Sequence, residues 1–220
     1  MFPHIILLSM DTEVGLNRRN ALNYEYERLP ITDENIIPPS FITERFDTRS
    51  PVVPSHLWSY LCILRMIIDR KMDSVVVCED DAFLIGDLKD LIGLKKTTLC
   101  GGVIHGSVDF KDGVNPVQNP WTQMFAIYYP TWQEAKRIYD YTMKSPILQV
   151  YDVFLSQHKL INQLFYPSIF VGIDNIDENR QRHQGISQIG NVPDGVIMNY
   201  KVLGSSQEVF DRVTKHLFKI

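Results

Sequence analysis

The feature that most constrains this fold is an apolar run at residues 75–78, Val-Val-Val-Cys, which stops on three consecutive carboxylates, Glu79, Asp80 and Asp81. The run does not alternate polar and apolar residues, which is typical of a strand buried on both faces of an α/β sheet. Three adjacent anions repel each other and favour solvent. At the carboxyl end of a central parallel strand they would lie where open α/β sheets bind ligands. The alternative is a strand that runs into an acidic surface turn.

Strands and helices alternate along the rest of the chain. Apolar patterning predicts strands at residues 4–9, 75–78, 97–104, 121–129 and 164–171. Helical spacing and start signals predict helices at residues 16–28, 54–71, 131–144, 145–160 and from 205 onward. This order indicates an α/β fold with a mostly parallel central sheet flanked by helices, which we expect to form one domain over residues 1–220. The segment 105–120, rich in Gly, Asp, Asn and Pro, is predicted to be a mobile loop over the site.

Composition and charge exclude several classes of protein. With 22 basic and 26 acidic residues, a net charge of -4 and a pI near 5.8, the chain offers no general attraction to nucleic acid or anionic membrane. No basic region precedes the short apolar run at 5–8, and no apolar stretch is long enough for a membrane span. We therefore expect a cytoplasmic protein whose cysteines, Cys62, Cys78 and Cys100, are reduced.

Several short motifs follow one another in a recognisable order. They are a strand leading to an Arg-Arg pair, a Glu-Arg-Phe-Asp segment, a Ser-His helix start, the Glu-Asp-Asp strand end, an aromatic strand, and Asp-x-Phe-Leu. The residues are 5–9, Arg18-Arg19, 44–47, Ser55-His56, 79–81, 125–135 and 152–155, with Pro167 and 187–189 after them. Over residues 4–190 this order resembles the GT-A glycosyltransferases, and most of all glycosyltransferase family 25, the lipopolysaccharide-type transferases. The short form is also similar to cytosolic glycosyltransferase domains encoded by large DNA viruses, which would place it in the host cytoplasm.

The resemblance implies a GT-A fold that transfers a sugar from a nucleotide-diphosphate donor, a UDP-sugar, to a hydroxyl of a glycan or glycoprotein acceptor, with inversion. It also implies a divalent ion, Mn²⁺ or Mg²⁺, that stabilises charge on the leaving diphosphate. Asp81 is the expected direct ligand, with Asp80 as a second ligand or a contact to the nucleotide. Glu79, which shares the side of Asp81 in an extended strand, would contact the ribose or support the ligands. His183 would complete the metal shell or touch phosphate, unless it is simply solvated.

The nucleotide would be bound by residues that follow the first strand and the proline-rich segment. Arg18 and Arg19, at the start of the predicted helix, are a candidate anion cradle; the alternative is that they are solvated. The expected nucleoside contacts are Ser9, Asp11, Arg45 and Asp47.

The chemistry also needs a carboxylate to take the acceptor proton, and Asp152 is the candidate. Asp152 lies near a predicted helix start, so a helix-capping role is the alternative. We interpret His56 as a structural residue.

Two other functions fit part of the sequence. Asp11-x-Glu13 after a strand is similar to the first motif of DEDD-type 3′–5′ exonucleases, but His105 and Asp109 have the wrong spacing for the later motif. The acidic balance also argues against a nucleic-acid groove. The remaining alternative is a catalytically inactive module that binds sugar nucleotides.

Overall fold

The computed structural model describes residues 2–9, 13–28, 38–46, 52–105, 110–117, 121–166, 168–172 and 196–198. Its strands are β1 (His4–Leu8), β2 (Glu27–Arg28), β3 (Val75–Glu79), β4 (Ala82–Leu84), β5 (Thr98–His105), β6 (Gly113–Pro116), β7 (Trp121–Tyr129), β8 (Gln163–Tyr166), β9 (Phe170–Gly172) and β10 (Val196–Met198). Its helices are α1 (Glu13–Ala21), α2 (Ser40–Thr43), α3 (Val52–Asp69), α4 (Trp132–Lys144) and α5 (Tyr151–Gln157), with a 3₁₀ turn at Leu88–Leu91.

The described strands form one large sheet, ordered β2-β1-β3-β7-β5-β8-β6 with β10 paired to β5, and one small sheet of β4 and β9. The α/β class is confirmed, but the prediction of a mostly parallel sheet is wrong. The pairings β1–β2, β1–β3 and β5–β8 are parallel, whereas β7 runs antiparallel to both of its neighbours, and β6 and β10 are antiparallel to theirs. An apolar run indicates that a strand is buried on both faces, but it does not indicate the direction of the strand. The sequence pattern therefore could not distinguish parallel from antiparallel pairing.

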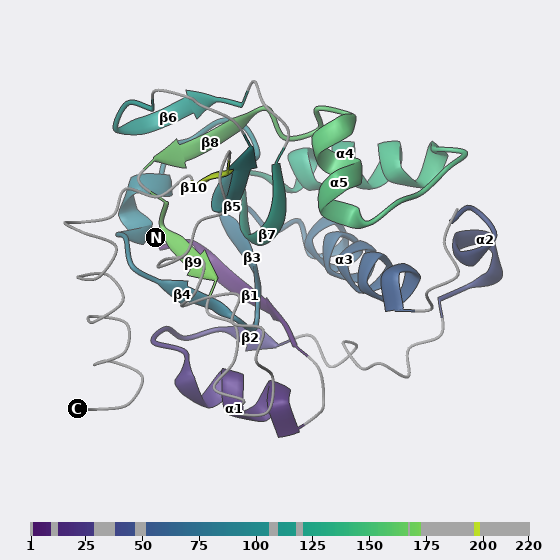
Figure 1. Cartoon of the computed structure of the whole chain (residues 1–220), viewed down its shortest axis with the longest axis horizontal. Helices are drawn as coiled ribbons and strands as arrows, with labels where there is room; N and C mark the ends of the chain where they lie inside the picture. The colour runs from purple at the N-terminus through teal and green to yellow at the C-terminus, as the bar shows by residue number, and fades with distance from the viewer. Residues whose placement is uncertain are drawn as a thin grey trace.

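Strand β3 lies between β1 and β7 in the sheet, and its residues from Val75 to Cys78 are fully buried. The side chains of Val75 and Val77 join the core under the helices, together with Leu57 of α3. Val76 and Cys78 join the core on the opposite face, next to β4 and β9. Figure 1 shows α3, α4 and α5 grouped on one side of the sheet, and α1, β4 and β9 on the other. The Glu79–Asp81 carboxylates therefore stand at the end of a strand that is buried on both faces.

The small sheet begins directly after the acidic turn and is fixed by the segment that follows α1. The side-chain amide of Asn23 donates to the Leu84 carbonyl at 2.8 Å and accepts from the Leu84 amide at 3.1 Å, as a neighbouring strand would. The Tyr24 hydroxyl donates to the Ala82 carbonyl at 2.7 Å. On the other side, β9 approaches β5 so closely that a Cβ at Gly101 would lie 2.9 Å from the Phe170 carbonyl oxygen.

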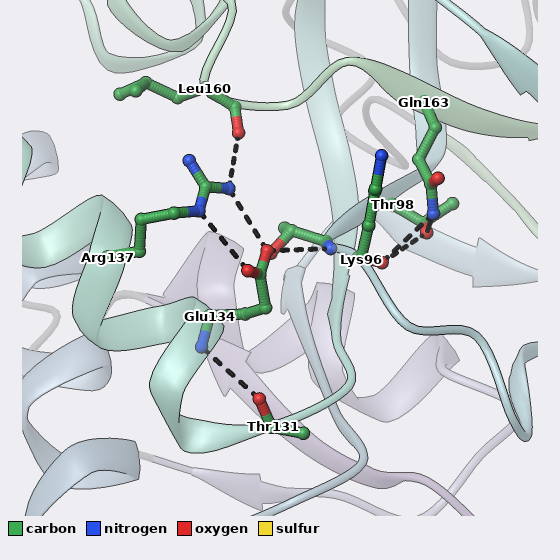
Figure 2. A network of polar contacts seen from close by, with 8 residues as sticks. Lys96, Thr98, Thr131, Glu134, Arg137, Leu160 and Gln163 are labelled. Atoms are coloured by element: carbon green, nitrogen blue, oxygen red, sulfur yellow. Dashed lines mark hydrogen bonds and ion pairs between the residues drawn. The ribbon is translucent and has the colours of Figure 1, made fainter.

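Helix α4 begins where the sequence predicts and is tied to the sheet by its first turn. Thr131 caps the helix by accepting from the Glu134 amide at 3.4 Å. The Glu134 carboxylate accepts from the Thr97 amide and hydroxyl and from Arg137, and Arg137 also donates to the Leu160 carbonyl (Figure 2). This network joins α4 to the start of β5 and to the loop before β8.

Four element predictions differ from the structure. The helix expected at 16–28 ends at Ala21, and β2 follows it. The helix expected at 145–160 is confined to α5, from Tyr151 to Gln157. The segment 105–120, expected to be a loop, contains β6, which pairs with β8. The strand expected at 164–171 is divided into β8 and β9, which belong to different sheets. The helix predicted from residue 205 lies outside the described residues. In the described part of the chain, no helix combines the length and apolar character needed to cross a membrane.

Candidate functional site

The carboxyl ends of three parallel strands meet at one edge of the large sheet. Leu8, the last residue of β1, pairs with Glu79, the last residue of β3, and Leu7 pairs with Arg28, the last residue of β2. Parallel strands end at the same edge, so Ser9, Arg28 and the turn after β3 are brought together from three separate segments. Ligands of open α/β sheets bind at edges of this kind.

Ser9 and Asp80 form the centre of this edge. The Ser9 hydroxyl donates to Asp80 Oδ2 at 2.8 Å, and the two residues are only 2% and 5% exposed. A buried carboxylate is costly unless hydrogen bonds and an opposite charge compensate it. Asp80 has both partners, because Arg18 Nη1 donates to its Oδ1 at 3.0 Å.

Two further guanidinium groups reach Ser9. Arg19 Nη1 donates to the Ser9 hydroxyl at 2.5 Å, and Arg28 Nη2 donates to the Ser9 carbonyl at 3.3 Å. The expectation that Arg18 and Arg19 open a helix is wrong, because they lie in the last turn of α1. The two arginines therefore do not lie at the helix amino terminus. The cationic character of the cluster comes from three guanidinium groups, a geometry suited to carboxylate and phosphate oxygens.

Asp81 lies on the Tyr24 side of the same edge. Burial raises the pKa of Tyr24 well above its usual value, and the charges of Asp81 and Asp80 add to that effect. The prediction that Asp81 shares a side with Glu79 assumed a continuous strand. The strand ends at Glu79, and Asp80 and Asp81 form a turn. The alternation on which that prediction depended therefore does not extend to Asp81.

Glu79 belongs to a second cluster, on the face of the sheet covered by helices. His56 Nε2 lies 3.1 Å from Glu79 Oε1, and the Tyr60 hydroxyl donates to the same oxygen at 3.1 Å. His56 and Tyr60 are four residues apart on α3 and so share a face of the helix. Their rings meet edge to face at 5.2 Å, and Tyr60 packs in turn against Tyr151 of α5 at 4.9 Å.

Asp152 lies in the first turn of α5, within electrostatic range of His56. Burial alone would lower the pKa of His56, but the hydrogen bond and charge of Glu79 and the charge of Asp152 raise it above the usual value for histidine. Asp152 does not occupy the N-cap position, which is Val150, and its Oδ1 accepts from the Val153 amide at 2.6 Å. The predicted base therefore lies within electrostatic range of a histidine for which the sequence indicates only a structural role.

The structure does not bring every predicted site residue to this edge. The Arg45 guanidinium donates to the carbonyls of Thr142 and Ser145, at the carboxyl end of α4, which gives it a helix-capping contact. Asp11, Asp47 and His183 lie outside the described residues. Of the predicted nucleotide and metal contacts, Ser9, Arg18 and Asp80 are bonded to one another, and Asp81 lies in the same turn as Asp80. Glu79 is adjacent in the chain but faces the helices.

The described residues supply carboxylates but do not complete a metal centre. Asp80 and Asp81 carry the oxygen ligands that Mn²⁺ and Mg²⁺ prefer. Both oxygens of Asp80, however, already accept from Ser9 and Arg18. Within the ranges that the structure describes, no three His, Cys, Asp or Glu side chains are grouped to hold a metal ion. A metal centre at this edge would need ligands from outside those ranges, where His183 lies.

Three site residues, Arg28, His56 and Tyr60, are not predicted from the sequence as functional, because their sequence signals are weak. For Arg28, the helical pattern that extends to residue 28 gives no indication of a strand end. His56 and Tyr60 were detectable as an i, i+4 pair of polar-tipped rings on a mostly apolar helix. Nothing in the sequence, however, showed that this face of the helix meets the end of β3.

No family model matches this chain, and a search of the curated proteins finds no match to it. The resemblance to family 25 transferases therefore stays a prediction. The function has to be argued from the geometry of the sheet edge.

Proposed function

We propose that this chain is a GT-A-type glycosyltransferase that binds the diphosphate of a nucleotide sugar at the edge formed by β1, β2 and β3. One observation carries the proposal: the guanidinium groups of Arg18, Arg19 and Arg28 converge on the Ser9–Asp80 pair at the carboxyl ends of parallel strands. Guanidinium groups bind phosphate oxygens through paired N–H donors. The edge itself is where α/β sheets place their ligands.

The same edge offers a group for each half of the reaction. Sugar transfer places negative charge on the leaving diphosphate and releases a proton from the attacking hydroxyl. The arginine cluster is suited to the first task. His56, Glu79 and Asp152, on the helical face, are suited to the second. Glu79 and Asp80 are adjacent in the chain, so the two clusters are neighbouring parts of one edge.

The finer features of the proposal come from the family resemblance. They are a UDP-sugar donor, a glycan or glycoprotein hydroxyl as acceptor, and inversion at the anomeric carbon. A divalent ion, Mn²⁺ or Mg²⁺, would stabilise charge on the diphosphate. Asp81 would hold it, together with ligands outside the described residues.

Calorimetry with UDP, in the presence and absence of Mn²⁺, tests the binding half of the proposal. We expect Arg19→Gln to weaken UDP binding about 10- to 100-fold, because it removes one charge-assisted hydrogen bond of about 1.5–3 kcal/mol. Arg65→Gln is the matched control, because Arg65 forms an exposed pair with Asp69 on α3. Its affinity for UDP should equal that of the wild type.

Two results would contradict this proposal. One is the absence of UDP binding by the wild-type protein at millimolar concentration, with or without Mn²⁺. The other is equal weakening by Arg19→Gln and Arg65→Gln. Release of UDP from a sugar nucleotide separates the transferase from the inactive binding module, which would bind the donor and leave it intact.

A further inference from the structure

His56 is a partly exposed imidazole held against the end of the central strand. Its side chain keeps 36% of its surface exposed, whereas Glu79 keeps 24% and Tyr60 is fully buried. The exposed part is open to a bound molecule, and the contacts with Glu79 and Tyr60 fix the orientation of the ring. A surface histidine without such partners would populate several rotamers and would have no single ring orientation.

The partners of His56 also determine which ring nitrogen can accept a proton. His56 Nε2 lies 3.1 Å from Glu79 Oε1. A carboxylate accepts hydrogen bonds, and the tautomer that donates to it from Nε2 carries its lone pair on Nδ1. The Tyr60 hydroxyl donates to the same carboxylate oxygen and keeps it directed at the ring. A carboxylate that holds a histidine tautomer and stabilises the imidazolium is the arrangement that serves general-base catalysis in unrelated enzymes.

The charged groups around His56 favour the protonated ring once a proton arrives. Among the described residues these are Glu79 from β3 and Asp152 from α5, and the two carboxylates raise the pKa of His56 although burial opposes them. The neighbouring phenols, Tyr60 and Tyr151, stay neutral because burial raises the pKa of each well above its usual value. The imidazolium would thus face two negative charges and no described positive one.

An imidazole is well matched to this task. The best catalytic base has a pKa near the operating pH, and histidine is the side chain whose unperturbed pKa lies in that range. Asp152 already accepts the Val153 amide through Oδ1, which leaves less of its carboxylate to accept a substrate proton.

We infer that His56, oriented by Glu79, takes the proton of the attacking hydroxyl, and that Asp152 acts through its charge on the imidazole. This rests on the proposed function. In the step, the hydroxyl oxygen forms a bond to the anomeric carbon, and the bond from that carbon to the diphosphate breaks with its electron pair leaving on the nucleotide. The hydroxyl proton passes to His56 Nδ1. Glu79 is a positioning residue.

The test uses a panel of UDP- and GDP-sugars with water as acceptor and measures release of the nucleotide. His56→Gln should lower turnover about 10²- to 10⁴-fold and change affinity for the free nucleotide less than twofold. Glu79→Gln should lower turnover and move the acidic limb of the pH–rate profile to lower pH, because loss of its charge lowers the pKa of His56. If Glu79 had only a structural role, Glu79→Gln would lower the stability of the fold and leave the acidic limb of the pH–rate profile unchanged.

The chain supplies a matched control pair at the opposite end of the sheet. His4, the first residue of β1, bonds through Nε2 to the Glu27 carboxylate at 2.9 Å, and Arg70 bonds to the other oxygen of that carboxylate. His4→Gln and Glu27→Gln should leave the turnover and the pH–rate profile unchanged. Titration of His56 by NMR, in the wild type and in Glu79→Gln, measures the coupling without any substrate.

The outcomes separate this inference from the proposed function. Near wild-type turnover in His56→Gln overturns the inference and leaves the transferase standing. A His56 pKa that Glu79→Gln does not lower overturns it as well, whatever the nucleotide results. Absence of UDP binding contradicts the proposed function, and binding without turnover of any sugar in the panel contradicts the base, since a binding module removes no proton.

Discussion

Glu79 and Asp80 are neighbours in the chain, yet their carboxylates have different partners. Asp80 is buried with Ser9 and Arg18, which makes it a fixed part of the edge. Glu79 is directed to the helical face, where His56 and Tyr60 hold it. The two adjacent carboxylates therefore each have their own hydrogen-bond donors. The sequence predicted that these carboxylates end a central strand, but not which donors each one meets, because the donors come from segments far away in the chain.

Asp152→Asn separates the two candidate bases. If Asp152 acts through its charge on His56, this variant should lose less turnover than His56→Gln, and its acidic limb should move to lower pH. If Asp152 takes the proton itself, the loss should reach about 10²- to 10⁴-fold and His56→Gln should be the milder change. Initial rates of nucleotide release across pH, with UDP affinity as a control, decide between them.

At the scale of elements, the predicted strands and helices with strong patterns are present. Helix α3 and strands β1, β3, β5 and β7 lie where apolar patterning placed them, because burial on one or both faces determines that pattern. The same patterning failed at residues 164–171, where β8 and β9 are both apolar but pair with different sheets. Tertiary contacts, including the bonds from Ser168 and Ile169 to the Cys100 carbonyl, fix where that segment changes sheets.

The Glu134 network predicts a pH-dependent stability for the docking of α4. Burial raises the pKa of Glu134, but the hydrogen bonds from Arg137 and Thr97 outweigh it and lower the pKa below the usual value. A carboxyl whose pKa is lower in the folded protein than in the unfolded chain stabilises the folded protein at pH values above the unfolded pKa, which is about 4.3 for glutamate. This stabilisation is lost as the pH falls through the pKa of the folded protein. Glu134→Gln should therefore lower the free energy of unfolding by about 1–3 kcal/mol at pH 7. The difference from the wild type should shrink below pH 4.

Chemical denaturation at pH 7 and at low pH measures this effect. The control is Asp140→Asn, which removes an exposed pair with Lys136 on the same helix. Asp140→Asn should lower the free energy of unfolding by no more than about 0.5 kcal/mol. A penalty for Glu134→Gln that is the same at both pH values would show that the carboxylate charge does not stabilise the docking of α4.

At the scale of the whole molecule, the site is assembled by topology. Ser9 and Asp80 are 71 residues apart in the chain, and His56 lies 23 residues before Glu79. They meet because β1, β2 and β3 are parallel neighbours, and because α3 packs on the helical face of the sheet. The sequence indicated strands and carboxylates. It could not indicate that β7 would run antiparallel, or that three arginines would converge on one Ser9–Asp80 pair.

Binding of a nucleotide diphosphate at the carboxyl edge of β1, β2 and β3 can be measured by an NMR titration that follows backbone amide shifts of the chain as UDP is added. We expect the largest shifts at Ser9, Arg18, Arg19, Arg28 and Asp80. We expect small shifts at the opposite edge, around His4 and Ser74. Shifts that gather at that opposite edge, or no saturable shifts at millimolar UDP, would contradict binding at the carboxyl edge.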